Sequence, residues 1–128
     1  MLSGFHHVKV PVSDVERSRD WYERVLGLQR DLEFVENGEL MGVTLRDAGG
    51  TVCVGLRREP ERAAALKGFA PVSLNAATRG ALDAWCRRLE RLGESHGGVH
   101  PAYYGHVLVG LHDPDGIEIR IYTEDDGT

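Results

Sequence analysis

The stretch FHHVKVPVSDVERSRDWYERVLGL, residues 5–28, decides the fold. Its first part, residues 5–12, alternates between residue types and is rich in β-branched side chains, which predicts a strand. Ser13 stands three positions before Glu16, the spacing of a capping box, so a helix is expected to begin there. Apolar residues then recur at helical spacing until Gly27, a residue type that ends helices in the left-handed conformation. The stretch therefore predicts a strand followed by an amphipathic helix.

Short strands are expected to follow this helix. The candidate segments are residues 30–36, 41–47 and 51–57. Asn37-Gly38 separates the first two, and the glycine-containing residues 48–50 separate the last two, as hairpin turns do. The first half of the chain thus has the order strand, helix and three strands.

The same order begins again in the second half. Residues 60–67 are alanine-rich and start with proline, which predicts a short linking helix. Another strand and an amphipathic helix ending at Gly93 come next, and an irregular edge strand is expected within the glycine-rich segment that follows. The strands predicted after the linking helix cover residues 69–76, part of 94–105, 106–112 and 117–123.

Equal offsets in the two halves support an internal repeat. His7 precedes Trp21 by the same number of positions by which Pro71 precedes Trp85. LRDAGGTVCVGL, beginning at Leu45, also aligns without a gap with LHDPDGIEIRIY. The sequence therefore predicts two copies of one βαβββ module.

The opening stretch, together with HDPDGIEIRIY at residues 112–122, resembles the vicinal-oxygen-chelate superfamily of glyoxalases, bleomycin-resistance proteins and extradiol dioxygenases. The resemblance implies an α+β fold in which two tandem βαβββ modules form an open, barrel-like cup that holds a ligand or a metal, commonly as a homodimer. The expected organisation is one domain over residues 1–128, with modules at about 4–58 and 69–123 and a linking helix at about 60–67.

Charge and composition exclude several classes of function. The chain has 20 acidic and 15 basic residues, with no basic stripe, so a nucleic-acid partner is not expected. It has neither a long apolar run nor the pattern of a secretory signal, which predicts a cytoplasmic protein without membrane contact. The two cysteines, Cys53 and Cys86, have no metal-motif spacing and are expected to be small core residues.

Metal ligands of the family come from the first and last strands of each module. By the resemblance and the repeat, those positions are His7, Val54, Pro71 and Arg120. Valine and proline have no donor atom and arginine keeps its charge, so no metal cofactor is expected. The alternative is a divalent metal held by His7 and Glu118, the latter in place of the missing glutamate.

Strand alternation predicts which side chains line the cup. His7 and Lys9 should point into it, and His6 the other way. Tyr104 either rims the mouth or packs in a loop, and Glu118 with Arg120 either binds ligand or forms an ion pair that only solvates the sheet. The predicted ligand-binding residues are His7, Lys9, Val54, Ser73, Asn75, Tyr104, Glu118, Arg120 and Tyr122.

These residues support several functions, because one scaffold carries many activities. The preferred hypothesis is a metal-free protein that binds a small organic molecule and sequesters it, as bleomycin-resistance members do with a natural product. The alternative is an enzyme, either a metal-free one in which His7, Lys9 or Glu118 transfers a proton at a carbonyl compound, or a metal-dependent lyase, isomerase or dioxygenase. The sequence leaves open whether there is catalysis.

Overall fold

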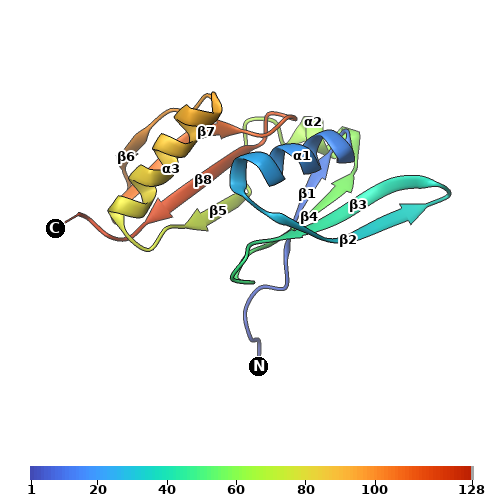
Figure 1. The fold of residues 1–128 in the computed structure, drawn as a ribbon, viewed down its shortest axis with the longest axis horizontal. Helices are drawn as coiled ribbons and strands as arrows, with labels where there is room; N and C mark the ends of the chain where they lie inside the picture. Colours follow the sequence, from blue (N-terminus) through green and yellow to red (C-terminus); the bar gives the residue numbers. More distant parts are fainter. Residues whose placement is uncertain (128) are drawn as a thin grey trace. The chain divides into compact units, whose positions relative to one another are not determined.

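The computed structural model describes residues 1–127, which divide into two compact units. Unit 1 comprises Met1–Leu66, and unit 2 begins at Lys67. Each unit is a βαβββ module with one four-stranded open sheet, so the predicted α+β class and the tandem repeat of modules are confirmed (Figure 1).

Unit 1 follows the predicted order of elements, and the short helix expected after its last strand is present at its end. Its sheet has the strand order β1-β4-β3-β2, in which β1 runs parallel to β4 and the other neighbours are antiparallel. The elements are β1 Val8–Val12, α1 Val15–Leu26, β2 Gln29–Glu36, β3 Glu39–Arg46, β4 Cys53–Arg58 and α2 Pro60–Ala65.

Unit 2 repeats this topology with the strand order β5-β8-β7-β6, and β5 runs parallel to β8. The irregular edge strand expected after the second helix is present as the short β6. The elements are β5 Val72–Asn75, α3 Arg79–Leu92, β6 Val99–Pro101, β7 His106–His112 and β8 Glu118–Thr123. No helix within residues 1–127 has the length and apolarity needed to cross a membrane.

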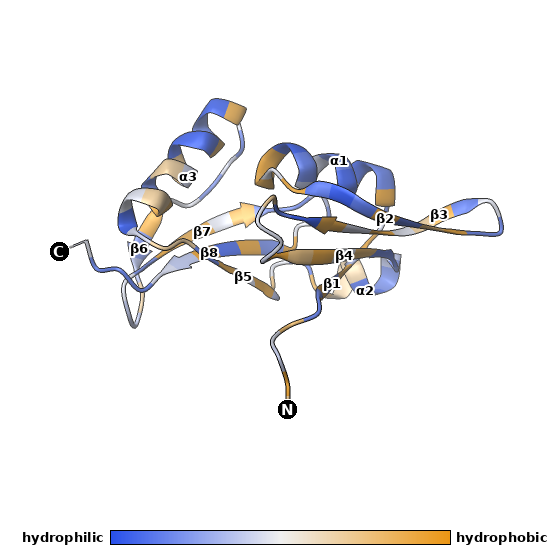
Figure 2. Cartoon of the chain, turned by 60° about the horizontal axis from the view of Figure 1, so that its bottom comes forward, coloured by the Kyte–Doolittle hydropathy of each residue, from blue (hydrophilic) through white to orange (hydrophobic). Residues whose placement is uncertain are grey.

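The core of unit 1 lies between α1 and one face of its sheet. Tyr22 and Val25 of α1 are fully buried, and the helix contacts β3 and β4. Val54 and Leu56 of β4 are at most 2% exposed, and β4 shows hydrophobic colour along part of its length in Figure 2. Side chains alternate along a strand, so the residues between them face the other side of the sheet.

Matching caps bound the long helices of the two units. Asp14 accepts a hydrogen bond from the Arg17 amide at the start of α1, and Thr78 plays the same part in α3. The first cap is therefore Asp14 and not the predicted Ser13. Gly27 and Gly93 follow the two helices in the left-handed conformation, with φ near 71° and 72°. These glycines reverse the chain toward the next strand.

The structure corrects the alignment of the two modules by one residue. Asp47 and Val52 close the turn before β4, whereas Asp113 and Ile117 close the equivalent turn before β8. The first turn is thus one residue longer than the second. In the strand pairing, Gly55 lies beside Lys9 as Arg120 lies beside Ser73, so Gly55 is the counterpart of Arg120. Val54 is therefore the counterpart of Ile119.

Candidate functional site

A cavity of about 340 Å³ lies on the face of the unit 1 sheet that carries Lys9, which we call the Lys9 face. Parallel pairing sets Lys9 beside Gly55, and antiparallel pairing sets Gly55 beside Thr44, so the three residues share this face. Leu32 and Phe34 of β2 give the cavity an apolar side. This combination of apolar wall and few polar groups is typical of a site for a small organic molecule.

Glycine residues on the floor of the cavity make room for its other side chains. A Cβ on Gly55 would lie 3.2 Å from Cδ2 of His7, so the imidazole packs directly against the bare backbone of β4. A Cβ on Gly42 would come within 2.9 Å of the Leu56 carbonyl oxygen. Both positions therefore favour glycine, and any side chain there would displace neighbouring atoms.

Two histidines lie together at the edge of the cavity. The Nδ1 atoms of His6 and His7 are 2.8 Å apart, so one ring donates a hydrogen bond and the other accepts it. The prediction that His6 points the other way is wrong. Strand β1 begins only at Val8, so the alternation of a strand does not apply to the two histidines that precede it.

Lys9 differs from the other cations of this face. Arg46 binds Asp31 at 2.8 Å, and Arg57 binds Glu36. These hydrogen bonds from arginine hold the pKa of both carboxyl groups below the usual value.

Lys9, by contrast, has no hydrogen-bond or ion-pair partner among residues 1–127. The Lys9 face thus offers one positive charge that is not already neutralised.

In unit 2, five of the predicted residues share a sheet face. Arg120 and Tyr122 alternate along β8 with the buried Ile119 and Ile121, and their partners on β5 are Ser73 and Asn75. Glu118 belongs to the same side of β8. The structure thus brings Ser73, Asn75, Glu118, Arg120 and Tyr122 together on one face, as the sequence predicts.

Glu118 is a buried carboxylate with partners inside unit 2. Its Oε2 accepts a hydrogen bond from the Gly110 amide at 2.8 Å, and its Oε1 lies 3.1 Å from Nε of Arg120. Burial alone would raise the pKa of Glu118, but the Gly110 hydrogen bond and the Arg120 guanidinium together bring it below the usual value. The ion pair that the sequence left as an alternative is present.

Two predicted ligand-binding residues lie apart from these faces. Val54 is 1% exposed and belongs to the buried face of the unit 1 sheet, so it does not join His7 and Lys9. Tyr104 lies in the turn between β6 and β7, is 80% exposed and is not on the sheet. The one-residue error in the repeat alignment explains the first misplacement.

The positions expected for metal ligands hold few donors. With the corrected alignment they are His7, Gly55, Pro71 and Arg120, of which only His7 has a donor atom suited to a cation. Cys53 also borders the unit 1 cavity, half-buried and not in the core as predicted.

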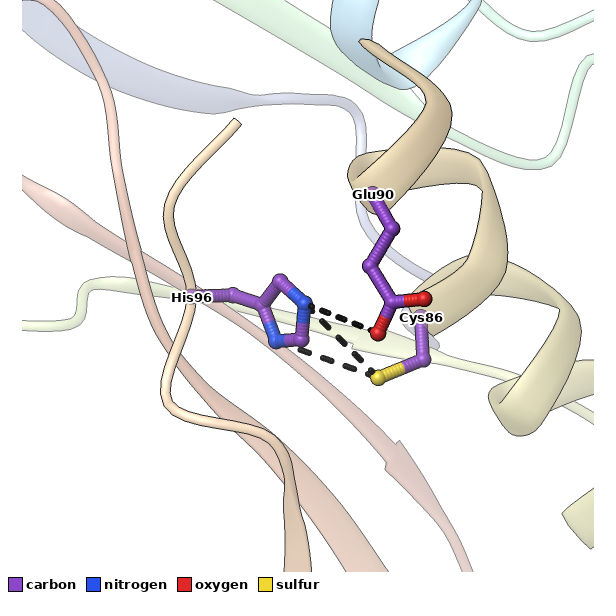
Figure 3. Close-up of side chains that lie close together, drawn as sticks. All are labelled: Cys86, Glu90 and His96. Carbon is purple, nitrogen blue, oxygen red and sulfur yellow. Dashed lines mark hydrogen bonds and ion pairs between the residues drawn. The ribbon is translucent and has the colours of Figure 1, made fainter. Parts of the chain in front are cut away.

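One set of three donors within residues 1–127 was missed by the sequence reasoning. Cys86, Glu90 and His96 place a sulfur, an oxygen and a nitrogen within 4.8 Å of one another (Figure 3). Cys86 was expected in the core but is half-buried, and the His96 side chain beside it is 12% exposed. The signal in the sequence was the i, i+4 spacing of Cys86 and Glu90 on the helix that ends before Gly93.

Comparisons with known proteins agree with this fold. A domain from Frankia sp. EAN1pec described as glyoxylase/bleomycin resistance protein/dioxygenase has a TM-score of 0.78 and 21% identity, covering 96% of this chain and 98% of that one. TnmS3, an antibiotic binding protein from Streptomyces sp. CB03234, has a TM-score of 0.75 and 23% identity, with 95% and 96% covered. Lactoylglutathione lyase from Agrobacterium tumefaciens has a TM-score of 0.75 and 17% identity, and the match covers 95% of this chain and 94% of that one.

At these identities the structural matches establish the fold alone. A search among curated proteins found no match. The comparison with protein families matches residues 4–121, nearly the whole chain, to one family. The chain therefore belongs to the Glyoxalase/Bleomycin resistance protein/Dioxygenase superfamily.

Proposed function

We propose that this protein binds a small organic molecule on the Lys9 face of unit 1, and that it holds the molecule without a metal at His7. The observation that carries the proposal is the cavity of about 340 Å³, which has an apolar side and also contains Lys9, a cation that has no partner among residues 1–127. A ligand with an apolar, ring-bearing body and one anionic group fits this arrangement.

The contacts of the cavity suggest a part for each group. Leu32 and Phe34 are about half exposed and would be covered by the apolar body of the ligand. Lys9 would neutralise its anionic group, and the paired histidines would donate or accept one further hydrogen bond. One structural relative is named an antibiotic binding protein, which is in line with sequestration of a natural product as the biological role.

Lys9→Met is expected to weaken binding of an aromatic sulfonate, 1-anilinonaphthalene-8-sulfonate, by about fivefold to tenfold, the value of one partly exposed charged contact. Methionine keeps the length and apolar stem of the side chain but removes the charge. The measurement is a fluorescence titration of the purified protein at low ionic strength.

Lys67→Met is the matched control, because Lys67 is the only other lysine and belongs to unit 2. It should leave the affinity unchanged. Equal losses in the two variants, or none in Lys9→Met, would show that the probe binds elsewhere and would contradict the proposed site.

We also propose a homodimer, supported by the edge strand β2. All eight of its residues are exposed, its outer edge pairs with no other strand among residues 1–127, and Val35, which is not part of the cavity, is 63% exposed. Val35→Ser should shift the sedimentation of the protein toward the 14.1 kDa monomer. A wild-type protein that sediments as a monomer at high micromolar concentration would refute the dimer.

A further inference from the structure

We propose that Cys86, Glu90 and His96 form a binding site for one thiophilic divalent cation such as Zn²⁺, separate from the Lys9 face. The three side chains belong to unit 2 and occupy none of the positions at which the sequence places family ligands. The proposal therefore does not depend on the proposed function.

The fold of unit 2 brings these donors together. Cys86 and Glu90 are four residues apart on α3, so they lie one above the other on one face of the helix. Gly93 ends the helix in the left-handed conformation and turns the chain back. His96, three residues later, then points its ring toward the two helix residues, as Figure 3 shows.

The distances between donor atoms suit a shared ion. Sγ of Cys86 lies 3.8 and 3.9 Å from the two ring nitrogens of His96, and Nε2 of His96 lies 3.7 Å from Oε1 of Glu90. Neighbouring ligand atoms around a tetrahedral zinc ion are about 3.3–3.6 Å apart, given metal–ligand bonds of about 2.0–2.3 Å. All three donor atoms lie within 4.8 Å of one another, so side-chain rotations that bring them about 1 Å closer would close the site around an ion.

The chemistry of the donors selects the type of ion. A thiolate and an imidazole prefer Zn²⁺ and related transition metals to Mg²⁺ or Ca²⁺, which need more oxygen ligands. Three protein ligands leave a fourth tetrahedral position for water. Glu90 is largely exposed, with its side chain at 65%, so an ion can reach the site from solvent.

One contact of His96 limits the affinity. The Gly98 amide donates a hydrogen bond to Nδ1 at 3.0 Å, so in the metal-free chain the ring proton of the neutral imidazole is on Nε2, toward Glu90. Coordination through either nitrogen breaks this bond, because Nδ1 then holds either the metal or the proton. We therefore expect micromolar affinity and a change in the environment of the Gly98 amide.

The test uses the full chain, stripped with a chelator and titrated with Co²⁺, whose complexes with thiolates absorb in the near ultraviolet. The expected result is one equivalent of Co²⁺ with a thiolate charge-transfer band, displaced by Zn²⁺. Cys86→Ser should abolish the band, and His96→Gln should weaken Zn²⁺ binding by about tenfold or more. Glu90→Gln changes a side chain that is 65% exposed and should weaken Zn²⁺ binding by about threefold to fivefold.

Controls come from the other cysteine and from a nearby histidine. Cys53→Ser should keep the band, and His100→Gln, on β6, should keep the affinity, because His100 bonds the Gly97 carbonyl and is not among the three donors. The proposal is overturned if wild-type protein gives no band at saturating Co²⁺, or if the band depends on Cys53 instead of Cys86. It is also overturned if Glu90→Gln and His96→Gln both bind Zn²⁺ like the wild type while remaining folded by circular dichroism.

Discussion

Gly105→Ala is expected to lower the free energy of unfolding by about 3–5 kcal/mol, as the sum of a left-handed backbone strain and a steric clash. Gly105 has φ near 65° in the turn before β7. A Cβ there would lie 2.0 Å from the Thr123 carbonyl oxygen and 2.8 Å from the Glu124 carbonyl carbon. Both contacts are with backbone, so the clash is relieved only if the end of β8 moves away from β7.

Gly38→Ala is the matched control for this prediction. Gly38 also has a positive φ, near 79°, but a Cβ there meets no atom within 4 Å. The Gly38→Ala variant should lose only the part of the free energy of unfolding that comes from backbone strain, about 1 kcal/mol. Urea denaturation of both variants gives the comparison, and equal losses would mean that the contact between the β6–β7 turn and the end of β8 is not as the structure shows.

The fold was predictable because local signals agree with one another along the chain. Apolar periodicity identified both long helices, and Gly27 and Gly93 marked their ends. The repeat then predicted the topology of the second unit from that of the first. β6 was the weakest prediction, because its segment is glycine-rich and short strands at sheet edges have few packing constraints.

The register of β4 was not predictable from the gapless alignment. One extra residue in the turn after Asp47 moves every following side chain to the opposite face of the sheet. Val54 was thus assigned to the ligand face when it is in the core, and Gly55, which lies under His7, was missed. Turn length is set by the hydrogen bonds of the turn, which hydrophobic pattern alone does not reveal.

The donor set of Cys86, Glu90 and His96 was missed for a different reason. Cys86 and His96 have no spacing typical of metal motifs, and they meet only because the chain reverses at Gly93 and returns along the helix. The sequence shows the i, i+4 pair of Cys86 and Glu90, but that spacing is common on exposed helix faces. Only the tertiary path of residues 93–98 adds the third donor.

Arg120→Ala is expected to cost about 1–2 kcal/mol of stability at pH 7, because it leaves the buried Glu118 carboxylate with the Gly110 amide as its remaining hydrogen bond shown in unit 2. The loss is smaller than for a fully buried pair, since the Arg120 side chain is 38% exposed and water screens it. Chemical denaturation at several pH values measures the effect.

The pH dependence distinguishes this ion pair from general loss of packing. The pKa of Glu118 in the folded protein is below its usual value of 4.5. The ionised Glu118 therefore contributes fully to folding stability above pH 4.5, and this contribution is lost as the pH falls through the pKa of the folded state. In Arg120→Ala the guanidinium no longer lowers the pKa of Glu118, so burial raises this pKa relative to that of the wild type. The difference in stability between wild type and variant should therefore shrink below about pH 4.5.

Glu118→Gln provides the background that isolates the charge interaction, because glutamine can still accept the hydrogen bond from Gly110. In that background Arg120→Ala should cost little at any pH. An equal cost in both backgrounds would assign the effect to packing of the arginine stem. If instead Arg120→Ala leaves stability unchanged but weakens binding of an anionic ligand, Arg120 acts mainly as a ligand-binding residue, and the ion pair with Glu118 only orients it.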